Sequence, residues 1–469
     1  MWENIKKIKK HRIIKEMLNR WIQAREGFFG ELRRLALPII FQNLIAAAVT
    51  MADVVMLGRV TQTALSASSL AGQVQFLLNI VYFGLSSALT ILASQYWGKK
   101  DRMTIGKIFG MGLIISLVFS AGACVCALIA PRTVMRVWTN IPELVDAGAR
   151  YLRFAAFSYL FAGITQPYHS IMKSCENVLL SSVISTVTLA VNVVLNAVLI
   201  FGLLGAPAMG IEGAALATTI SRGVELCICT VHFAGQKMLP RHPLNIFRIP
   251  RLLVADFVRY SMPAFVNDAM WGFAFNMNSI IMGHLGSDIV AANSIVTVAR
   301  DLISTVGFAL AAACSIMLGK EIGEGRAEIA RGDASSFMKV TFLTALAQGA
   351  VLLVISPFVP HMVRISANAA SMLRIMLLVN SVYQIGIMIN TLLIASIFRC
   401  GGDSRYGMVL DILCMWFVAV PLGLISAFIL KLPPLIVYLF MCTDEFVKMP
   451  FALRHYFKGK WIRNLTREF

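Results

Sequence analysis

Residues 35–58 read LALPIIFQNLIAAAVTMADVVMLG, and residues 260–283 read YSMPAFVNDAMWGFAFNMNSIIMG. Both stretches have a proline at the fourth position and close on two apolar residues and a glycine. An offset of 225 residues relates five pairs of positions: Pro38 and Pro263, Gly58 and Gly283, Ala67 and Ala292, Ser69 and Ser294, and Gly98 and Gly323. A constant offset without a gap predicts a chain made of two equivalent halves.

The composition indicates an integral membrane protein. Of the 469 residues, 58% are hydrophobic and 14% are charged, whereas soluble domains usually carry about 25% charged residues. The apolar segments run for about twenty residues or more, which is long enough for helices to cross a ~30 Å hydrocarbon core. The sequence lacks the alternating pattern of a membrane β-barrel. We therefore predict an all-α integral membrane protein.

The basic residues fit a membrane protein better than a nucleic-acid-binding protein. The formal net charge is +18, and residues 1–34 alone hold ten Lys or Arg against four Glu. The remaining excess lies mostly in short loops, as expected when positive loops set the orientation and contact anionic lipid. The sequence therefore predicts a lipid bilayer as partner and no nucleic acid.

Twelve apolar segments predict twelve membrane spans: 35–57, 67–96, 104–129, 151–172, 178–203, 210–234, 258–284, 289–318, 336–358, 371–397, 406–430 and 432–452. Loops after even-numbered spans are the richer in Lys and Arg, which predicts a multi-pass protein of the cell membrane with both termini in the cytoplasm. Six spans per half is an even number, so the halves share one orientation, as parallel repeats do.

This pattern divides the chain into five predicted regions: a basic amphipathic cytoplasmic segment (1–34), an N-terminal six-helix lobe (35–235), a cytoplasmic linker (236–256), a C-terminal six-helix lobe (257–455) and a basic cytoplasmic tail (456–469). In the first region, an interfacial helix is expected. Its apolar face would hold Ile14, Met17, Leu18, Trp21 and Ile22.

Several motifs follow one another along the chain. They are Pro38 with Asp53 and Gly58, Ser94-Gln95-Tyr96-Trp97-Gly98-Lys99-Lys100-Asp101, Asn192-Val-Val-Leu-Asn196 with Gly202, Gly205-Ala-Pro207-Ala-Met-Gly210-Ile-Glu-Gly213, and Arg399-Cys-Gly401-Gly402-Asp403. With the repeat, they make residues 33–455 resemble the multidrug and toxic compound extrusion (MATE) transporters. The resemblance implies two six-helix lobes around a central cavity, and export of organic, often cationic compounds in exchange for Na⁺ or H⁺.

Asp53 is the strongest candidate for the chemistry of transport. An ionised Asp at membrane depth costs roughly 2.5–3.5 kcal/mol on insertion scales, so it normally faces a cavity or a partner. A carboxylate binds either Na⁺ or H⁺, and the resemblance implies a cation-coupling site in the N-terminal lobe. Asn192 and Asn196 share one helix face and match the polar pair of the family, while Gln42 is a further candidate. The alternative is a set of hydrogen bonds that serve packing alone.

The C-terminal lobe offers Asp268, Arg300 and Asp301 as candidates to bind substrate charge or relay protons. Some family members carry the acid of this span eight positions after the proline, where this chain has Trp271, so the match at Asp268 is inexact. Asp268 is a predicted partner of Arg300. Adjacent helical residues point about 100° apart, so Arg300 and Asp301 are expected to reach different partners or to line a polar cavity. A structural ion pair is the alternative.

Weaker candidates are polar residues on other spans. Arg222 and Glu225 are spaced for an intrahelical ion pair, for which a structural role is the favoured interpretation. Asn278 and Asn390 are candidates to line the C-terminal lobe. Asp411, near the cytoplasmic start of its span, is expected to be solvated.

The sequence predicts a monomeric secondary transporter that exchanges Na⁺ or H⁺ for small organic, cationic compounds by alternating access. It contains no GxxxxGK[ST] and no HExxH, so neither ATP-driven transport nor metallohydrolase chemistry is indicated. We predict no enzyme activity, no cofactor and no metal beyond a transported Na⁺. The alternative is a flippase for a lipid or a lipid-linked oligosaccharide, in which Arg222 and Arg300 would hold phosphate.

Overall fold

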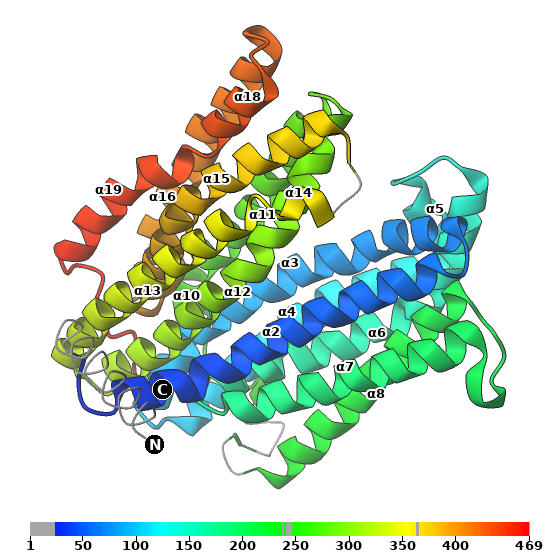
Figure 1. The fold of residues 1–469 in the computed structure, drawn as a ribbon. Helices are drawn as coiled ribbons and strands as arrows, with labels where there is room; N and C mark the ends of the chain where they lie inside the picture. Colours follow the sequence, from blue (N-terminus) through cyan, green and yellow to red (C-terminus); the bar gives the residue numbers. More distant parts are fainter. Residues whose placement is uncertain (1–23, 237–238, 241–245, 363–364, 469) are drawn as a thin grey trace, which may run out of the picture. The chain divides into compact units, whose positions relative to one another are not determined.

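The regular elements of the chain are helices (Figure 1). The computed structural model describes residues 24–236, 239–240, 246–362 and 365–468, and within these ranges every regular element is helical. The first half holds α2 (Phe28–Gly58), α3 (Gln62–Gly98), α4 (Arg102–Ile129), α5 (Pro131–Arg136), α6 (Pro142–Ser174), α7 (Val178–Phe201), a 3₁₀ turn (Leu203–Gly205) and α8 (Ile211–Gly235).

The second half opens with α10 (Arg251–Tyr260), α11 (Met262–Gly283), α12 (Ser287–Gly323), α13 (Ala327–Ile355), α14 (Val359–Met362) and α15 (Ala367–Asn390). It continues with α16 (Ser404–Cys414), α17 (Val420–Leu424), α18 (Pro434–Met441) and α19 (Asp444–Phe457). Three π-helical segments extend α15, α16 and α17: Thr391–Phe398, Met415–Ala419 and Ile425–Ile429.

The bounds of the helices repeat along the chain as the sequence does. α3 and α12 each contain 37 residues, and both their first and their last residues are 225 positions apart. The starts of α4 and α13, and those of α6 and α15, have the same offset. The sequence repeat is therefore also a repeat of helices.

The turns that close the two 37-residue helices are also equivalent. After α3 the amides of Lys100 and Asp101 donate to carbonyls of the last helical turn, and after α12 the amides of Gly325 and Arg326 do the same. Lys100 and Gly325 have φ of 61° and 79°, the left-handed conformation that commonly ends a helix. A lysine in this conformation is strained by roughly 1–2 kcal/mol. The two turns therefore share one backbone conformation, although the residue is Lys100 in the first half and Gly325 in the second.

The helices pack into two compact units. Of the described residues, the N-terminal unit comprises those within Pro38–Gly272 and 465–468, and the C-terminal unit comprises those within 24–37 and Phe273–Asn464. The start of α2 thus belongs to the C-terminal unit, and the start of α11 belongs to the N-terminal unit. The predicted lobe boundaries in the 236–256 linker stay a prediction.

Named contacts hold these two helix starts in their units. The guanidinium of Arg25, just before α2, lies 2.8 Å from Asp333 and 2.9 Å from Glu321. The hydroxyl of Ser261, just before α11, donates to the carbonyl of Ala88 in α3 at 2.8 Å. Each unit therefore includes a helix start from the opposite half of the sequence.

In the N-terminal unit, α6 is largely covered by other helices, although Phe157 in its middle is exposed. It packs against α3, α4 and α8, and it buries polar side chains such as Thr165, His169 and Ser170. A helix surrounded by protein needs less apolar character than one that faces lipid. This explains why α6 is absent from the nine helices, among the described residues, that are long and apolar enough to cross a membrane.

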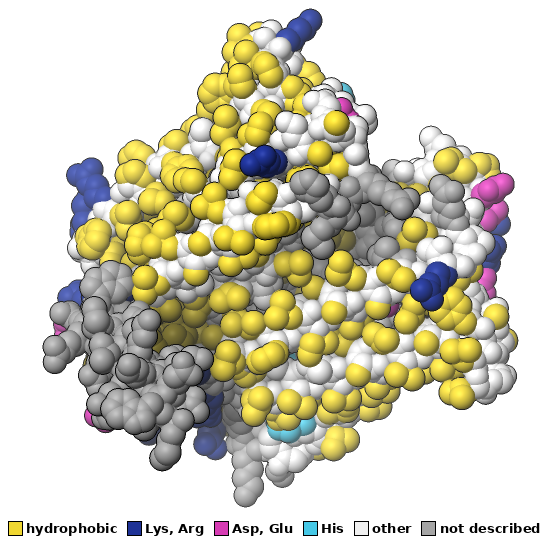
Figure 2. Space-filling model, in the orientation of Figure 1, with side chains coloured by type: hydrophobic (Ala, Val, Ile, Leu, Met, Phe, Trp, Pro, Cys, Tyr) yellow, Lys and Arg dark blue, Asp and Glu magenta, His cyan; other side chains and the backbone are white. Residues whose placement is uncertain are grey.

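The surface carries many large hydrophobic side chains, as expected for contact with lipid. Phe83, Leu179 and Val231 are exposed, and Figure 2 shows hydrophobic side chains over much of the helical surface in view. Each of the twelve predicted spans coincides with helix, although the seventh is interrupted between α10 and α11 and the twelfth between α18 and α19. The predicted all-α membrane fold is confirmed.

Two predictions fall partly or wholly outside the described residues. The amphipathic face of Ile14, Met17, Leu18, Trp21 and Ile22 lies in the segment 1–23, for which the structure gives no description. The predicted linker is described only at 236, 239–240 and from 246 onward, and α10 begins inside it at Arg251.

Two glycines of α13 provide a test of helix packing in the C-terminal unit. A Cβ on Gly349 would meet the backbone oxygen of Ser381 in α15, whereas a Cβ on Gly332 would meet nothing within 4 Å. We expect Gly349→Ala to lower the melting temperature of the detergent-solubilised protein, because overpacking costs typically ~1–3 kcal/mol. Gly332→Ala should leave it unchanged or raise it, since alanine favours helix by ~1 kcal/mol. Equal melting temperatures for the two variants would show that α13 and α15 lie farther apart at Gly349 than the structure has them.

Candidate functional site

Asp53 lies in a hydrogen-bonded row that joins α2 to α7. The Nδ2 of Asn196 donates to Oδ1 of Asp53 at 2.6 Å and to Oδ1 of Asn192 at 3.2 Å. Asn192 and Asn196 are one helical turn apart on α7, so their amides face the same side. The structure therefore brings together Asp53 and the Asn pair selected from the sequence.

A small cavity in the N-terminal unit adjoins this row. It has a volume of about 150 Å³ and is lined by Asp53 and Asn196 together with further residues, the polar ones being Thr50, Ser68, Ser69, Tyr151 and Thr218. The Oδ1 of Asn196 is buried and has no hydrogen-bond partner among the described residues. Carboxylate, amide and hydroxyl oxygens are the donors that hard cations prefer. The cavity is thus lined by one acidic side chain and several neutral oxygen-bearing ones, and an unpartnered amide oxygen belongs to one of its lining residues.

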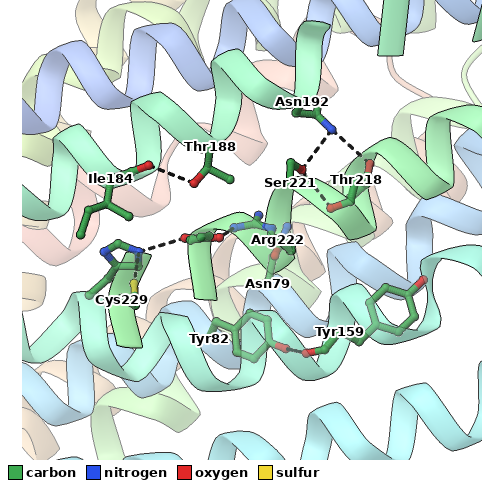
Figure 3. Close-up of polar contacts among 12 residues, drawn as sticks. Asn79, Tyr82, Tyr159, Ile184, Thr188, Asn192, Thr218, Ser221, Arg222 and Cys229 are labelled. Atoms are coloured by element: carbon green, nitrogen blue, oxygen red, sulfur yellow. Dashed lines mark hydrogen bonds and ion pairs between the residues drawn. The ribbon is translucent and has the colours of Figure 1, made fainter. Parts of the chain in front are cut away.

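The row continues from α7 to α8 (Figure 3). Nδ2 of Asn192 lies 3.4 Å from the hydroxyl oxygens of Thr218 and Ser221. These two hydroxyls donate in turn to backbone carbonyls of α8. Asn192 is therefore held on both sides, and it fixes the amide of Asn196 that contacts Asp53.

A buried ion network lies on α6, α7 and α8, beside the contacts of Asn192 in Figure 3. Nη1 of Arg222 donates to Oε2 of Glu225 at 2.6 Å, and Nε2 of His169 lies 2.9 Å from Oε1 of Glu225. The other ring nitrogen of His169 lies 2.8 Å from the hydroxyl of Ser181. The side chain of Glu225 is 1% exposed, so this carboxylate depends on Arg222 for charge compensation. The intrahelical pair predicted from the sequence is present, and His169 extends it to two further helices.

Two candidates of the N-terminal unit lie apart from this row. Gln42 accepts a hydrogen bond from Ser182 at 3.2 Å, and it is eleven residues before Asp53 on α2, or ~16 Å at 1.5 Å per residue. Asp268 is buried in the part of α11 that belongs to the N-terminal unit. Its predicted pairing with Arg300 stays a prediction.

Arg300 and Asp301 contact each other, contrary to the expectation that they reach different partners. Nε of Arg300 lies 3.5 Å from Oδ1 of Asp301, and the guanidinium carbon lies 5.3 Å from the ring centre of Phe275. The Asp301 side chain is 64% exposed, which weakens an ion pair of this kind. Asn278 has a buried Oδ1 without a hydrogen-bond partner among the described residues.

A second buried ion cluster occupies the C-terminal unit. Nζ of Lys448 lies 2.7 Å from Glu445 and 2.8 Å from Asp411, and Asn390 donates to both a side-chain and a backbone oxygen of Glu445 at 2.7 Å. Asp411 is buried, so the expectation that it is solvated is wrong. Asp411 can be buried because it forms an ion pair with Lys448 of α19, which is thirty-seven residues further along the chain.

Sequence reasoning missed several residues of these sites. His169 was a single histidine on a mostly apolar helix, and Thr218 and Ser221 looked like ordinary small residues of α8. The sequence did contain evidence for a further cluster, because three charged residues within five positions of a predicted span are rare at membrane depth. These residues are Asp444, Glu445 and Lys448. Their spacing also fits pairs on one helix face.

A family model matches both halves of the chain. The model described as MatE matches residues 38–198 and again residues 263–425, and both matches begin at the repeated proline. The chain belongs to the MatE family. The resemblance to MATE transporters is therefore confirmed, and as a member of a transporter family the chain is a multi-pass membrane protein rather than an enzyme.

Relatives of this MatE transporter span nearly its whole length. It is 27% identical over 416 residues to "Probable multidrug resistance protein NorM" of Chromobacterium violaceum, covering 86% of this chain and 87% of the relative. It is 22% identical over 448 residues to the protein of the same name from Thermotoga maritima, covering 93% and 94%.

Solved structures share the fold of the MatE chain. One is the MATE transporter VcmN of Vibrio cholerae, with a TM-score of 0.84 and 16% identity over 94% of this chain and 98% of that one. Another is a MOP superfamily transporter from Pyrococcus furiosus, with a TM-score of 0.82 and 17% identity over 93% and 99%. The MatE chain therefore has the architecture of these transporters.

The buried ion network predicts a large effect on the stability of the MatE transporter. Glu225→Gln removes a carboxylate that is 1% exposed and contacts both Arg222 and His169. Because the Arg222 side chain is 30% exposed, the expected loss lies below the ~3–5 kcal/mol that breaking a fully buried pair typically costs. Glu212→Gln breaks the pair in which Arg150 lies 2.7 Å from Glu212, with both side chains at least 30% exposed, where ~0–1 kcal/mol is expected. Thermal unfolding in detergent should therefore show a marked decrease for Glu225→Gln alone. Similar values for both variants would mean that water reaches Glu225.

Proposed function

We propose that the chain is a secondary active multidrug efflux transporter, which exchanges a Na⁺ ion or a proton held at Asp53 for organic, cationic, drug-like compounds. The observation that carries this proposal is the cavity of the N-terminal unit, which Asp53 and its hydrogen-bond partner Asn196 both line. A carboxylate kept at membrane depth is costly unless it has a partner or a visiting ion.

The geometry of the site supports binding of either coupling ion. A proton neutralises Asp53 and leaves Asn196 as its hydrogen-bond partner. A Na⁺ ion takes oxygen ligands, and the cavity offers Asp53, the Oδ1 of Asn196 and nearby hydroxyls such as Thr50 and Thr218. Asn192 orients Asn196 in both cases. Gln42, next to Ser182, would act on α7 rather than on the ion.

Exchange follows if the ion and the substrate favour opposite states of the transporter. A ligand shifts a conformational equilibrium only by its difference in affinity for the two states. The ion has such a difference in affinity when the surroundings of the Asp53 carboxylate differ between the two states. We propose that ion binding favours the outward-releasing state, that substrate binding favours return, and that Asp268, Arg300 and Asp301 serve substrate or proton binding.

The names of the relatives support drug-like substrates over lipids. The proteins from C. violaceum and T. maritima are both named as probable multidrug resistance proteins. A flippase would need cationic side chains that are available for phosphate, but Arg222 is paired with Glu225 and Arg300 with Asp301. The pairing of Arg222 with the buried Glu225 disfavours the flippase alternative, whereas the weak, exposed pair of Arg300 with Asp301 carries little weight.

Asp53→Asn tests the assignment of the coupling site. This variant keeps the size of the side chain and removes the charge, so we expect the gradient-driven efflux of ethidium, a fluorescent organic cation, to fall at least tenfold. The measurement uses proteoliposomes in which Na⁺ and pH gradients are imposed separately, and it also shows which ion drives transport. The control is Asp146→Asn, because Asp146 is an exposed acid paired with Arg132 and should transport normally. Wild-type efflux by a well-folded Asp53→Asn protein would overturn the proposal.

We also propose that the protein is monomeric and lies in the cell membrane with both termini in the cytoplasm. The loop at 203–205, after α7, should then face outward; its Leu204 is 93% exposed. A bacterial host that expresses an alkaline phosphatase fusion at 204 should show phosphatase activity, and a green fluorescent protein fusion after 469 should fluoresce. If the phosphatase fused at 204 were inactive and the fluorescent protein fused after 469 were dark, the orientation would be the reverse of the proposed one.

A further inference from the structure

The segment that follows α19 has contacts in both units. Of its described residues, 458–464 belong to the C-terminal unit and 465–468 to the N-terminal unit. Its contacts involve two sequence motifs, 94–101 and 399–403, to which the proposed function gives no role.

Trp461 anchors the segment in the C-terminal unit. Its side chain is 1% exposed, and its ring stacks with that of Tyr456 in α19, with the ring centres 6.1 Å apart. A Cβ on Gly401 would meet the backbone oxygen of Trp461, so this close approach requires glycine in the 399–403 motif. Two residues later, the amide of Arg463 donates to the carbonyl of Gly401 at 2.9 Å.

The end of α3 binds the backbone of the residues that follow. Oε1 of Gln95 accepts from the amide of Leu465 at 2.7 Å, and the hydroxyl oxygen of Tyr96 accepts from the amide of Arg467 at 3.0 Å. Nζ of Lys99 donates to the carbonyl of Arg467 at 3.0 Å. Three side chains of one motif therefore bind a peptide backbone.

Two side chains of the segment strengthen this contact with the N-terminal unit. Leu465 is buried and belongs to an apolar cluster of this unit. The guanidinium of Arg467 lies 2.8 Å from Asp256 of α10, whose side chain is 5% exposed. A buried carboxylate needs a positive partner, and Arg467 is a partner of this kind.

The C-terminal unit binds a different arginine at the equivalent positions. By the offset of 225 residues, Tyr96 corresponds to Glu321. By the same offset, Asp256 corresponds to Glu31. Arg25 lies 2.9 Å from Glu321 and 2.7 Å from Glu31. An arginine site that recurs at equivalent positions belongs to the repeated scaffold of both units, rather than to one loop.

The two anchors of the segment are close together in the chain. One residue, Asn464, separates the amide bound in the C-terminal unit from the first amide bound in the N-terminal unit. Two successive residues span at most about 7 Å. While both anchors are bound, the two binding sites cannot separate beyond the reach of this short link.

We propose that residues 461–467 form a strap, which restrains the two units on the cytoplasmic side and must leave the end of α3 before the transporter can open to the cytoplasm. The proposal rests on the proposed exchange function and orientation, because alternating access requires the units to move relative to each other on that side. Release occurs at the N-terminal unit, since Trp461 is buried against α19 whereas the Arg467 side chain is 44% exposed. The bound strap therefore favours the state that is closed to the cytoplasm.

A reversible cross-link tests whether the strap must be released. In the double variant Lys99→Cys with Glu468→Cys, a short bis-methanethiosulfonate reagent joins the strap to the end of α3, and a reductant removes the reagent. We expect the cross-link to reduce gradient-driven ethidium efflux at least fivefold, and reduction to restore it. Undiminished efflux by a protein in which mass spectrometry finds the cross-link would overturn the proposal.

Two sets of controls accompany the cross-link. Neither single variant can be cross-linked in this way, so the reagent should not change the efflux of either one. The double variant Arg132→Cys with Asp146→Cys places a cross-link between α5 and α6, within the N-terminal unit. Its efflux should be the same with and without the reagent.

Equilibrium binding of ethidium to the purified full-length protein gives a second test, which needs no gradient. Arg467→Ala removes the contact with Asp256, so it should increase the population that is open to the cytoplasm. The apparent Kd of a ligand falls as the state that binds it becomes more populated, and we expect the Kd of ethidium to fall at least twofold. Lys460→Ala removes an exposed basic residue of the same segment and should bind as the wild type does. An unchanged or higher Kd for Arg467→Ala would contradict the strap.

The two tests separate the strap from the function on which it rests. Loss of efflux in Asp53→Asn together with normal efflux in the cross-linked protein would support the exchange function and overturn the strap. Normal efflux in Asp53→Asn would overturn the exchange function, and the Kd of Arg467→Ala would still decide whether the strap restrains the units.

Discussion

The interior of a membrane contains no water, so a charged side chain placed there needs a partner within the protein or an ion that visits it. This constraint explains each polar group described above. Glu225 is neutralised by Arg222 and held by His169, and Lys448 gathers the carboxylates of two helices. Asp53 differs because its contact is a neutral amide, Asn196, beside a cavity. Among the described residues, the structure therefore gives the carboxyl of Asp53 a neutral hydrogen-bond partner and no ion pair.

The two halves have kept their helices but not their charges. The offset of 225 residues that relates the helix bounds places Asn278 opposite Asp53. The C-terminal unit instead holds buried acidic side chains on α16 and α19, around Lys448, and on α12 and α13, around Arg25. Packing constrains the length and spacing of helices, whereas a carboxylate can move to another helix of the same bundle as long as it finds a partner. The duplication thus produced two similar scaffolds with different electrostatics.

Much of the fold could be predicted from the sequence, because the length of an apolar segment and the repeat are local properties that the bilayer enforces. The contact between Asp53 and the Asn pair was also accessible, since a lone acid and two amides one turn apart are conspicuous in apolar spans. The contact of His169 with Glu225 and that of Lys448 with Asp411 were not. His169 and Lys448 reach them from helices distant in sequence, and which helices are neighbours follows from packing rather than from local pattern. The burial of Asp411 was mispredicted for this reason.

The exchange of helix starts between the units has a consequence for how such a protein can be divided. Arg25 anchors the beginning of α2 on Glu321 and Asp333 of the C-terminal unit, and Ser261 anchors the beginning of α11 on α3 of the N-terminal unit. A cut in the central linker would therefore leave each fragment without a segment that its own bundle requires. A gene that encoded a single half would have needed a second copy to supply these segments. The exchange of segments therefore favours synthesis of both halves in one chain.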